Sequence, residues 1–366
     1  MGHWGKVDLS FKRLILVAWL VLAELGCSSS AKQPLESRAI WVQCDAAGTP
    51  EEADEVLDRV VRGGFDTVLF CVGSGVVNYK SSLLTWSPSV TSEYDPLAYV
   101  VEQAHARGLK TQAWWSPGLA MTYGPLRDAH PEWDVAAVDG IPDSFHWLNF
   151  SRPEVRQFVG DVVLEIAENY DVDGVHLDYI RYFAPPPHGP VDPAEYFGSA
   201  DVPATVQSAY QRLKAARSDV QITAAVMAGQ GGSTNHLQSW ADWLAGGYID
   251  YVMPMAYFGP GESGQLKRYL REWRALPHFE RIMPGLSVEF SISSGKIDSK
   301  TADTLADQIE MCQAAGVRGI AVFDESAITD ELIEALVSDS SSPRVLRWGW
   351  FEKALRQLGI VSGATD

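Results

Sequence analysis

One acidic residue stands near the end of an apolar run in the middle of the chain. The run covers residues 174–180 and carries His176 and Asp178. If it forms a β-strand, alternate side chains share a face, so His176 and Asp178 point the same way. A carboxylate that points into a protein interior is costly unless it is paired or functional. We therefore take Asp178 as a candidate catalytic group. The structural alternative is an ion pair with Arg181 or a hydrogen bond to a neighbouring strand.

Eight short apolar runs recur along the chain and predict eight buried strands. They are nearly continuous in hydrophobicity, which is typical of parallel strands covered on both faces. The runs are residues 39–44, 67–72, 110–115, 174–180, 221–227, 251–257, 282–288 and 319–323.

Amphipathic segments lie between these runs and carry helix start signals. Thr49-Pro50-Glu51-Glu52 and Ser151-Arg152-Pro153-Glu154 have the pattern of a capping box with an early proline, and Asp95-Pro96 repeats the cap and proline. Further helices are expected near residues 202–217, 235–246, 262–274, 302–314 and 328–338. Strands that alternate with helices predict a closed parallel barrel or a doubly wound sheet. The length, and the lack of a glycine-rich phosphate loop after the first run, favour a single (βα)8 TIM barrel over residues 38–340.

Long segments follow the second, third and fourth predicted strands, at residues 73–94, 116–143 and 183–200. In a barrel such loops gather at the C-terminal ends of the strands, where active sites lie. A small hairpin is expected between residues 133–138 and 146–149. Residues 341–366 read as an extra C-terminal helix, at 344–358, followed by a tail.

The first 31 residues read as an export signal and a short linker. Basic residues precede a ten-residue apolar run, 14–23, which is too short to span a bilayer. Gly26-Cys27 follows, as at a bacterial lipoprotein cleavage site, with Cys27 as the lipidated residue. The alternative is ordinary cleavage near Ala31. We expect an exported protein that is lipid-anchored in the cell envelope (outer membrane or cell surface), or else periplasmic or secreted.

Charge and cysteine content exclude several classes of function. The formal net charge is -18, and a field of that sign repels nucleic acid. Apart from Cys27, the cysteines Cys44, Cys71 and Cys312 match no zinc spacing, and the sequence has no zinc-protease or calcium-loop motif. We expect no metal and no cofactor. Buried free thiols are the default, although Cys44 and Cys71 lie in neighbouring strands and are able to form a bridge.

Several pieces of the sequence together resemble one protein family. They are Arg38-Ala39-Ile40-Trp41, Gly64-Phe65-Asp66-Thr67-Val68, Tyr94-Asp95-Pro96-Leu97, Ala113-Trp114-Trp115, His130-Pro131-Glu132-Trp133 and Asn169-Tyr170-Asp171-Val172-Asp173-Gly174-Val175-His176-Leu177-Asp178-Tyr179. The chain resembles the bacterial glycosyl hydrolase-like 10 family of (βα)8 barrels. That resemblance implies a glycosidase, and characterised members are outer-membrane lipoproteins that act on peptidoglycan glycan strands. Many members carry two adjacent aspartates in the fourth strand, where this chain has Asp178-Tyr179.

Glycoside hydrolysis needs a second carboxylate, about 5–5.5 Å from the first for retention of configuration and about 6.5–9.5 Å for inversion. The sequence leaves both outcomes open. Glu289 is our first choice as the acid, because it follows an apolar strand whose setting would raise its pKa. Asp178 would then be the nucleophile or the base. Asp324 or Glu325, after the last strand, is the second choice, and Asp45 is the third.

Side chains at or near strand ends are candidate sugar contacts, since aromatic faces suit sugar rings and polar tips suit hydroxyls. They are Trp41, Trp114, Trp115, Asn149, His176, Arg181, Tyr182 and Tyr257. Each has barrel packing as its alternative, and His176 could instead orient Asp178. We therefore predict a glycosidase that acts on cell-wall or extracellular polysaccharide. The rival hypotheses are a non-catalytic, surface-anchored carbohydrate-binding barrel and a polysaccharide deacetylase or lyase.

Overall fold

The computed structural model describes residues 35–122, 124–229, 234–291 and 297–338. The predicted signal segment with Cys27 and the predicted helix at 344–358 lie outside these residues. None of the described helices is long and apolar enough to cross a membrane.

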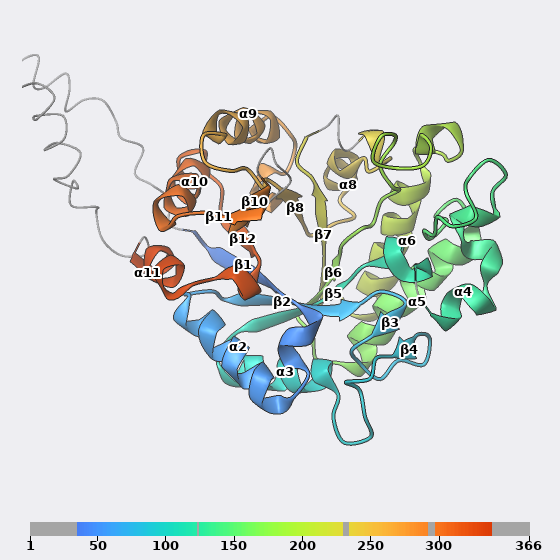
Figure 1. Cartoon of the computed structure of the whole chain (residues 1–366), viewed down its shortest axis with the longest axis horizontal. Helices are drawn as coiled ribbons and strands as arrows, with labels where there is room; N and C mark the ends of the chain where they lie inside the picture. The colour runs from blue at the N-terminus through green and yellow to red at the C-terminus, as the bar shows by residue number, and fades with distance from the viewer. Residues whose placement is uncertain (1–34, 123, 230–233, 292–296, 339–366) are drawn as a thin grey trace, which may run out of the picture.

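Within the described residues, eight parallel strands form a closed ring (Figure 1). Each strand pairs with the next along the chain, and the last pairs with the first, so that Ser37 lies opposite Gly319. The predicted TIM barrel is therefore confirmed. The strands are β1 (Ser37–Val42), β2 (Thr67–Gly73), β5 (Lys110–Trp115), β6 (Gly174–Leu177), β7 (Gln221–Met227), β8 (Tyr251–Met255), β9 (Gly285–Ser287) and β12 (Gly319–Phe323).

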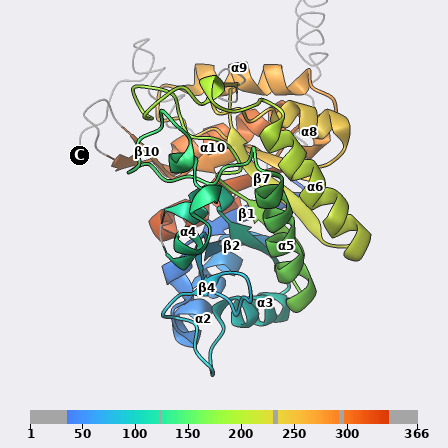
Figure 2. The same ribbon diagram turned by 90° about the vertical axis from the view of Figure 1, so that its right-hand side faces the viewer.

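Helices surround this ring in both views (Figures 1 and 2). They are α2 (Pro50–Arg62), α3 (Pro96–Ala106), α5 (Pro153–Asn169), α6 (Asp201–Ala216), α8 (Trp240–Gly246), α9 (Ser263–Arg274), α10 (Ala302–Ala314) and α11 (Asp330–Ser338), with the short α4 (Pro125–Ala129) in a loop. Thr49 and Glu52 form the predicted capping box, and Asp95 caps α3. The predicted cap at Ser151 is wrong. The helix begins at Pro153, so Arg152 occupies the cap position and provides no side-chain cap, and the Ser151 hydroxyl donates to Asn149.

Strand alternation divides the buried side chains into two sets. On β5, Trp114 belongs to the interior of the barrel, whereas its neighbour Trp115 packs between the strands and the helices. Trp41 of β1 also lies inside. The interior set is Ala39, Trp41, Leu69, Cys71, Trp114, Ala225, Met253, Met283 and Ala321. An aromatic side chain next to the candidate site must therefore belong to the inner set or to a residue beyond a strand end.

β6 ends at Leu177, three residues before the predicted end of the run. The cause is Tyr179, whose φ of 48° is left-handed and takes the backbone out of the strand. Gly118, in the loop after β5, lies against this turn, and a Cβ at that position would come within 2.3 Å of the Tyr179 carbonyl oxygen. The chain thus turns immediately after Asp178, at the C-terminal end of the strand.

The predicted long loops after β2, β5 and β6 are present and differ in structure. The first holds two short strands, β3 (Val76–Val77) and β4 (Thr85–Trp86), and is tied to α5 because the buried Glu165 accepts hydrogen bonds from Ser81 and Ser82. The second contains an isolated antiparallel bridge between Asp134 and Leu148 in place of the predicted hairpin. A separate antiparallel pair follows β9, namely β10 (Glu289–Ser291) and β11 (Ile297–Ser299).

Candidate active site

Asp178 lies directly after β6, at the C-terminal end of the barrel, with 7% of its surface exposed. Burial raises its pKa from 3.8 to about 6. A hydrogen bond of 2.7 Å from the Tyr179 N–H and the nearby charge of Arg181 partly oppose that shift. The indole of Trp114 also lowers this pKa, although its Nε1 makes no hydrogen bond within the described part of the chain. Asp178 can therefore hold a proton close to neutral pH, which an ordinary aspartate cannot.

His176 lies below this carboxylate and is completely buried. Its Nε2 is 3.1 Å from the Trp41 Nε1, and its Nδ1 is 2.8 Å from the Thr223 hydroxyl, which donates to Gln112. An indole N–H can only donate, so Nε2 accepts and the proton is on Nδ1. Burial lowers the pKa of His176 to about 3, which keeps the ring neutral. Of the roles considered for His176, the hydrogen-bonded interior histidine fits, because no ring nitrogen remains for a sugar.

Four other predicted sugar contacts are buried and support the fold. Trp41 and Trp115 are 1% and 0% exposed, Asn149 is 4% exposed, and Tyr182 is 0% exposed. The Trp115 indole donates to the Ser74 carbonyl, the Asn149 side chain accepts from Ser151, and the Tyr182 ring stacks on another ring of the outer core. Barrel packing, the alternative considered for each of them, accounts for these four side chains in this structure. Trp114, Arg181 and Tyr257 remain as candidates.

Phe323, the last residue of β12, is the centre of an aromatic group that the sequence did not single out. Its ring centroid is 5.2 Å from that of Tyr257 in a stacked arrangement. The rings of Trp41 and Trp114 meet it edge-on at 5.9 and 6.3 Å. The available signal was its position as the final residue of a predicted strand. Tyr179, directly after Asp178, is a second residue of the site that the sequence analysis did not predict, because its only signal is that many family members have an aspartate there.

Two carboxylates act on Tyr257. Burial is the main cause of the raised pKa of its hydroxyl, followed by the charges of Asp178 and then Asp324. The hydroxyl therefore keeps its proton and can donate a hydrogen bond. Tyr257 stacks on Phe323, which immediately precedes Asp324, and Phe323 also meets Trp114, so Tyr257 and Phe323 link the surroundings of the two carboxylates.

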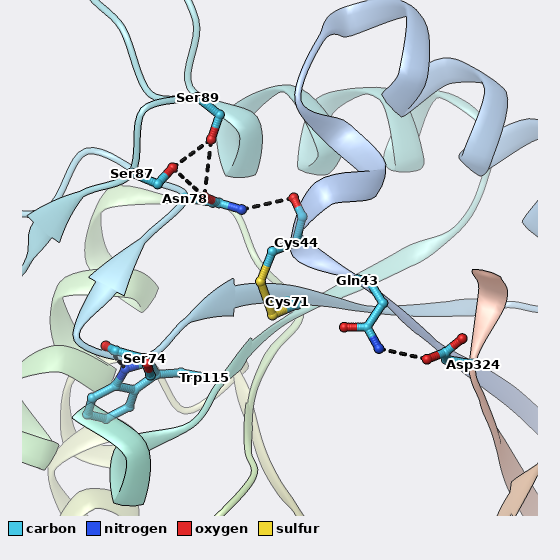
Figure 3. The surroundings of a disulfide bond; sticks show 9 residues. All are labelled: Gln43, Cys44, Cys71, Ser74, Asn78, Ser87, Ser89, Trp115 and Asp324. Atoms are coloured by element: carbon cyan, nitrogen blue, oxygen red, sulfur yellow. Dashed lines mark hydrogen bonds between the residues drawn. A yellow bond between two sulfur atoms is a disulfide. The ribbon is translucent and has the colours of Figure 1, made fainter. Parts of the chain in front are cut away.

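Asp324 has a different setting from Asp178. Its Oδ2 accepts a hydrogen bond of 2.7 Å from the Gln43 amide, as Figure 3 shows. Its Oδ1 accepts from the N–H and the hydroxyl of Ser326, at 3.1 and 2.6 Å. All three partners are donors, and an ionised carboxylate only accepts. Three donors therefore hold both carboxylate oxygens of Asp324 in place.

The other predicted carboxylates face different surroundings. Glu325 is buried and forms an ion pair with Arg59 of α2, while Asp45 is exposed in the short helix Cys44–Ala47. Both line a cavity of about 360 Å³ beside α2. Glu289 is exposed on β10, where it pairs with Ser299. The apolar setting that favoured Glu289 as an acid is therefore absent, and Asp324 becomes the better partner for Asp178.

A disulfide joins Cys44 to Cys71 across the ends of β1 and β2 (Figure 3). Their Cα atoms are 4.7 Å apart, and 27 positions separate them in the sequence. The Asn78 amide donates to the Cys44 carbonyl at 2.9 Å, so the same point is also held by the loop after β2. Since Gln43 precedes Cys44, the bridge anchors the backbone that carries the partner of Asp324. Cys312 is a buried free thiol.

Replacing both Cys44 and Cys71 by serine is expected to lower the free energy of unfolding by about 3–4 kcal/mol, the value for a cross-linked loop of roughly this length. Urea unfolding of the protein with and without reductant measures the effect. Reductant should leave the double variant unchanged. Equal midpoints for the oxidised and the reduced wild-type protein would contradict this expectation.

No group of three or more metal-ligating side chains that could hold an ion occurs among the residues described.

A family model described as glycosyl hydrolase-like 10 matches residues 36–290. The chain is 24% identical over 265 residues to glycosyl hydrolase DigH of Escherichia coli strain K12, covering 60% of each protein. It is 24% identical over 304 residues to glycosyl hydrolase YngK of Bacillus subtilis strain 168, covering 67% of this chain and 58% of that protein. The chain thus spans about 60% of the length of these curated relatives.

Solved structures share the fold at low sequence identity. The spore cortex-lytic enzyme SleL of Bacillus cereus has a TM-score of 0.56 at 10% identity, over 85% of this chain and 76% of that one. The C-terminal domain of a putative chitinase from Desulfitobacterium hafniense DCB-2 has a TM-score of 0.57 at 12% identity, over 84% of this chain and all of that one.

Proposed function

Because the chain belongs to the glycosyl hydrolase-like 10 family, we propose that it hydrolyses glycosidic bonds in bacterial cell-wall or extracellular polysaccharide. The observation that carries this proposal is the pair of carboxylates around Tyr257. Asp178 is buried with a raised pKa, and Asp324 accepts three hydrogen bonds. A carboxyl group that holds its proton near neutral pH, beside a second carboxylate held by hydrogen bonds, is the combination that this reaction uses.

In the proposed reaction, Asp178 protonates the oxygen of the scissile glycosidic bond, and the part of the glycan that carries this oxygen leaves as an alcohol. Asp324 either takes a proton from the water that attacks the anomeric carbon, or attacks that carbon itself to form a glycosyl ester. In the second route a water molecule, deprotonated by Asp178, then hydrolyses the ester. These routes correspond to inversion and retention of configuration. Tyr257 donates a hydrogen bond near the developing charge, and Phe323 and Trp114 provide apolar walls beside the sugar ring.

Incubation of the purified protein with peptidoglycan glycan strands and with extracellular polysaccharide tests the proposal. The expected result is the release of new reducing ends, measured against a heat-denatured control. Tight binding without reducing ends would instead support a carbohydrate-binding barrel. Release of acetate would identify a deacetylase, and unsaturated ends would identify a lyase.

We also propose that the protein is exported and anchored through a lipid at Cys27. The basic and apolar pattern before Gly26-Cys27 supports this, as does the Cys44–Cys71 disulfide, since such bonds persist in oxidising compartments. Mass spectrometry of the mature N-terminus distinguishes a lipidated Cys27 from cleavage near Ala31.

A further inference from the structure

Arg181 carries a largely buried positive charge three residues after Asp178. Burial lowers the pKa of its guanidinium, while the charge of Asp178 acts in the opposite direction. Within the described ranges, the ion pairs of arginine involve other residues, and no carboxylate oxygen lies within 4.0 Å of the Arg181 nitrogens. A buried cation without a counter-charge is unfavourable unless an anion joins it.

The contacts that hold Arg181 are uncharged. One Nη1 bond of 3.4 Å reaches the Tyr182 carbonyl, and Nη1 is 3.2 Å from the His236 Nδ1. The guanidinium carbon lies 4.7 Å from the centre of the Tyr179 ring and 5.8 Å from that of Trp147. Burial and the charge of Arg181 both lower the pKa of His236, so that this ring stays neutral. The group is therefore fixed in position, and no carboxylate pairs directly with it in the described ranges.

The contrast with Arg268 shows what is unusual. Arg268 also stacks on a tyrosine, Tyr269, at 4.6 Å, but its side chain is 53% exposed and it pairs with Glu272. Arg181 is stacked in the same way, but its side chain is less exposed to water than that of Arg268 and has no carboxylate partner in the described ranges. Arg181 stacks on Tyr179, the residue directly after Asp178, so an anion bound to Arg181 would lie near the candidate acid.

We propose that Arg181 binds a carboxylate carried by the glycan beside the scissile bond, so that the enzyme selects acidic polysaccharides. This inference rests on the proposed function. A guanidinium offers paired N–H donors that match a carboxylate, and the stack on Tyr179 keeps this donor set oriented. The carboxylate could belong to a uronic acid or to an acidic ether substituent such as that of muramic acid, and both present the same chemistry.

Paired substrates test this assignment. A uronic-acid polymer and muramic-acid-containing glycan strands free of peptide are each compared with their carboxyl-reduced forms. Wild-type protein is expected to hydrolyse at least one acidic form about tenfold faster in kcat/KM than its reduced form. Arg181→Gln should lower kcat/KM on the acidic form about tenfold more than on the reduced form, so that the preference falls to within about twofold. Arg181→Lys should keep part of the preference, and Arg268→Gln should keep all of it.

Other results would overturn the proposal. If Arg181 only adjusts the ionisation of Asp178, Arg181→Gln will shift the pH profile equally for acidic and reduced substrates and leave the preference intact. A wild-type protein with no preference would also reject the inference.

Binding to Asp178→Asn separates the inference from the proposed function. If Asp178→Asn binds the acidic ligand more tightly, if adding Arg181→Gln removes this effect, and if the wild-type protein hydrolyses no glycan, the site is upheld and the glycosidase is rejected. If the wild-type protein hydrolyses glycan but neither binds nor cleaves the acidic form preferentially, the glycosidase is upheld and the Arg181 site is rejected. Thermal melts of each variant confirm that it is folded.

Discussion

Asp178→Asn is expected to abolish hydrolysis and, at the same time, to stabilise the folded protein. Loss of a catalytic acid lowers rates by about 10²–10⁴-fold. Asparagine cannot supply the proton, but its carbonyl oxygen still accepts the hydrogen bond from the Tyr179 N–H. The variant therefore removes the chemistry and keeps the local structure.

The stabilisation follows from the raised pKa of Asp178, about 6 in the folded protein against 3.8 for an ordinary aspartate. Between these values the folded state holds more protons than the unfolded state, so the free energy of unfolding falls as pH rises through this window. The difference of about two pKa units corresponds to about 3 kcal/mol of lost stability at pH 7. This contribution is fully present below pH 3.8, and Asp178→Asn should regain most of it at neutral pH.

Urea unfolding at pH 4 and pH 7, together with a pH–rate profile, measures both effects. The gap in stability between variant and wild type should open as pH rises. If Asp178 is the acid, the wild-type rate should fall above about pH 6. A fall below that pH would make it the nucleophile or base. Wild-type activity in the variant would remove Asp178 from the mechanism altogether.

Asp324→Gly is expected to lower hydrolysis by about 10²–10⁴-fold and to be rescued by azide. The small anion can enter the space of the missing carboxylate and attack the anomeric carbon. A glycosyl azide of inverted configuration would assign Asp324 as the nucleophile or base, whereas retained configuration would make it the acid. Nuclear magnetic resonance of the product distinguishes these outcomes.

Glu289→Gln is the matched control for this experiment. Its side chain is exposed on β10, so activity should stay within about twofold of wild type and azide should have no effect. Loss of activity in Glu289→Gln with retention in Asp324→Gly would restore the residue that the sequence favoured.

The barrel was predictable because its signals are local and repeated. Apolar runs fix where β5 (Lys110–Trp115), β7 (Gln221–Met227) and β12 (Gly319–Phe323) begin and end. β6 was predicted too long because the left-handed turn at Tyr179 depends on packing against Gly118, which lies far away in the sequence. The Ser151 cap was also wrong, because α5 begins at Pro153 and Arg152 therefore holds the cap position.

The site was predictable in part. Alternation along one strand identified Asp178 but could not decide which of Trp114 and Trp115 faces the barrel interior. The identity of the second carboxylate depends on where the side chains that follow β12 point. Asp324 meets Gln43, while the adjacent Glu325 turns to Arg59 of α2. The two side chains point to partners in other parts of the chain, one directly after β1 and one in α2. The local sequence around 324–325 therefore does not predict which carboxylate lies in the site.

The Cys44–Cys71 disulfide has a consequence for the order of assembly. β1 must pair with both β2 and β12, so its second neighbour is among the last parts of the barrel to be synthesised. The cross-link encloses α2 and needs only the first strand, this helix and the second strand. In a chain that crosses a membrane from its N-terminus, this unit can become covalently closed while β12 is still untranslocated. β1 would then already lie beside β2, and its free edge would be ready to receive the final strand.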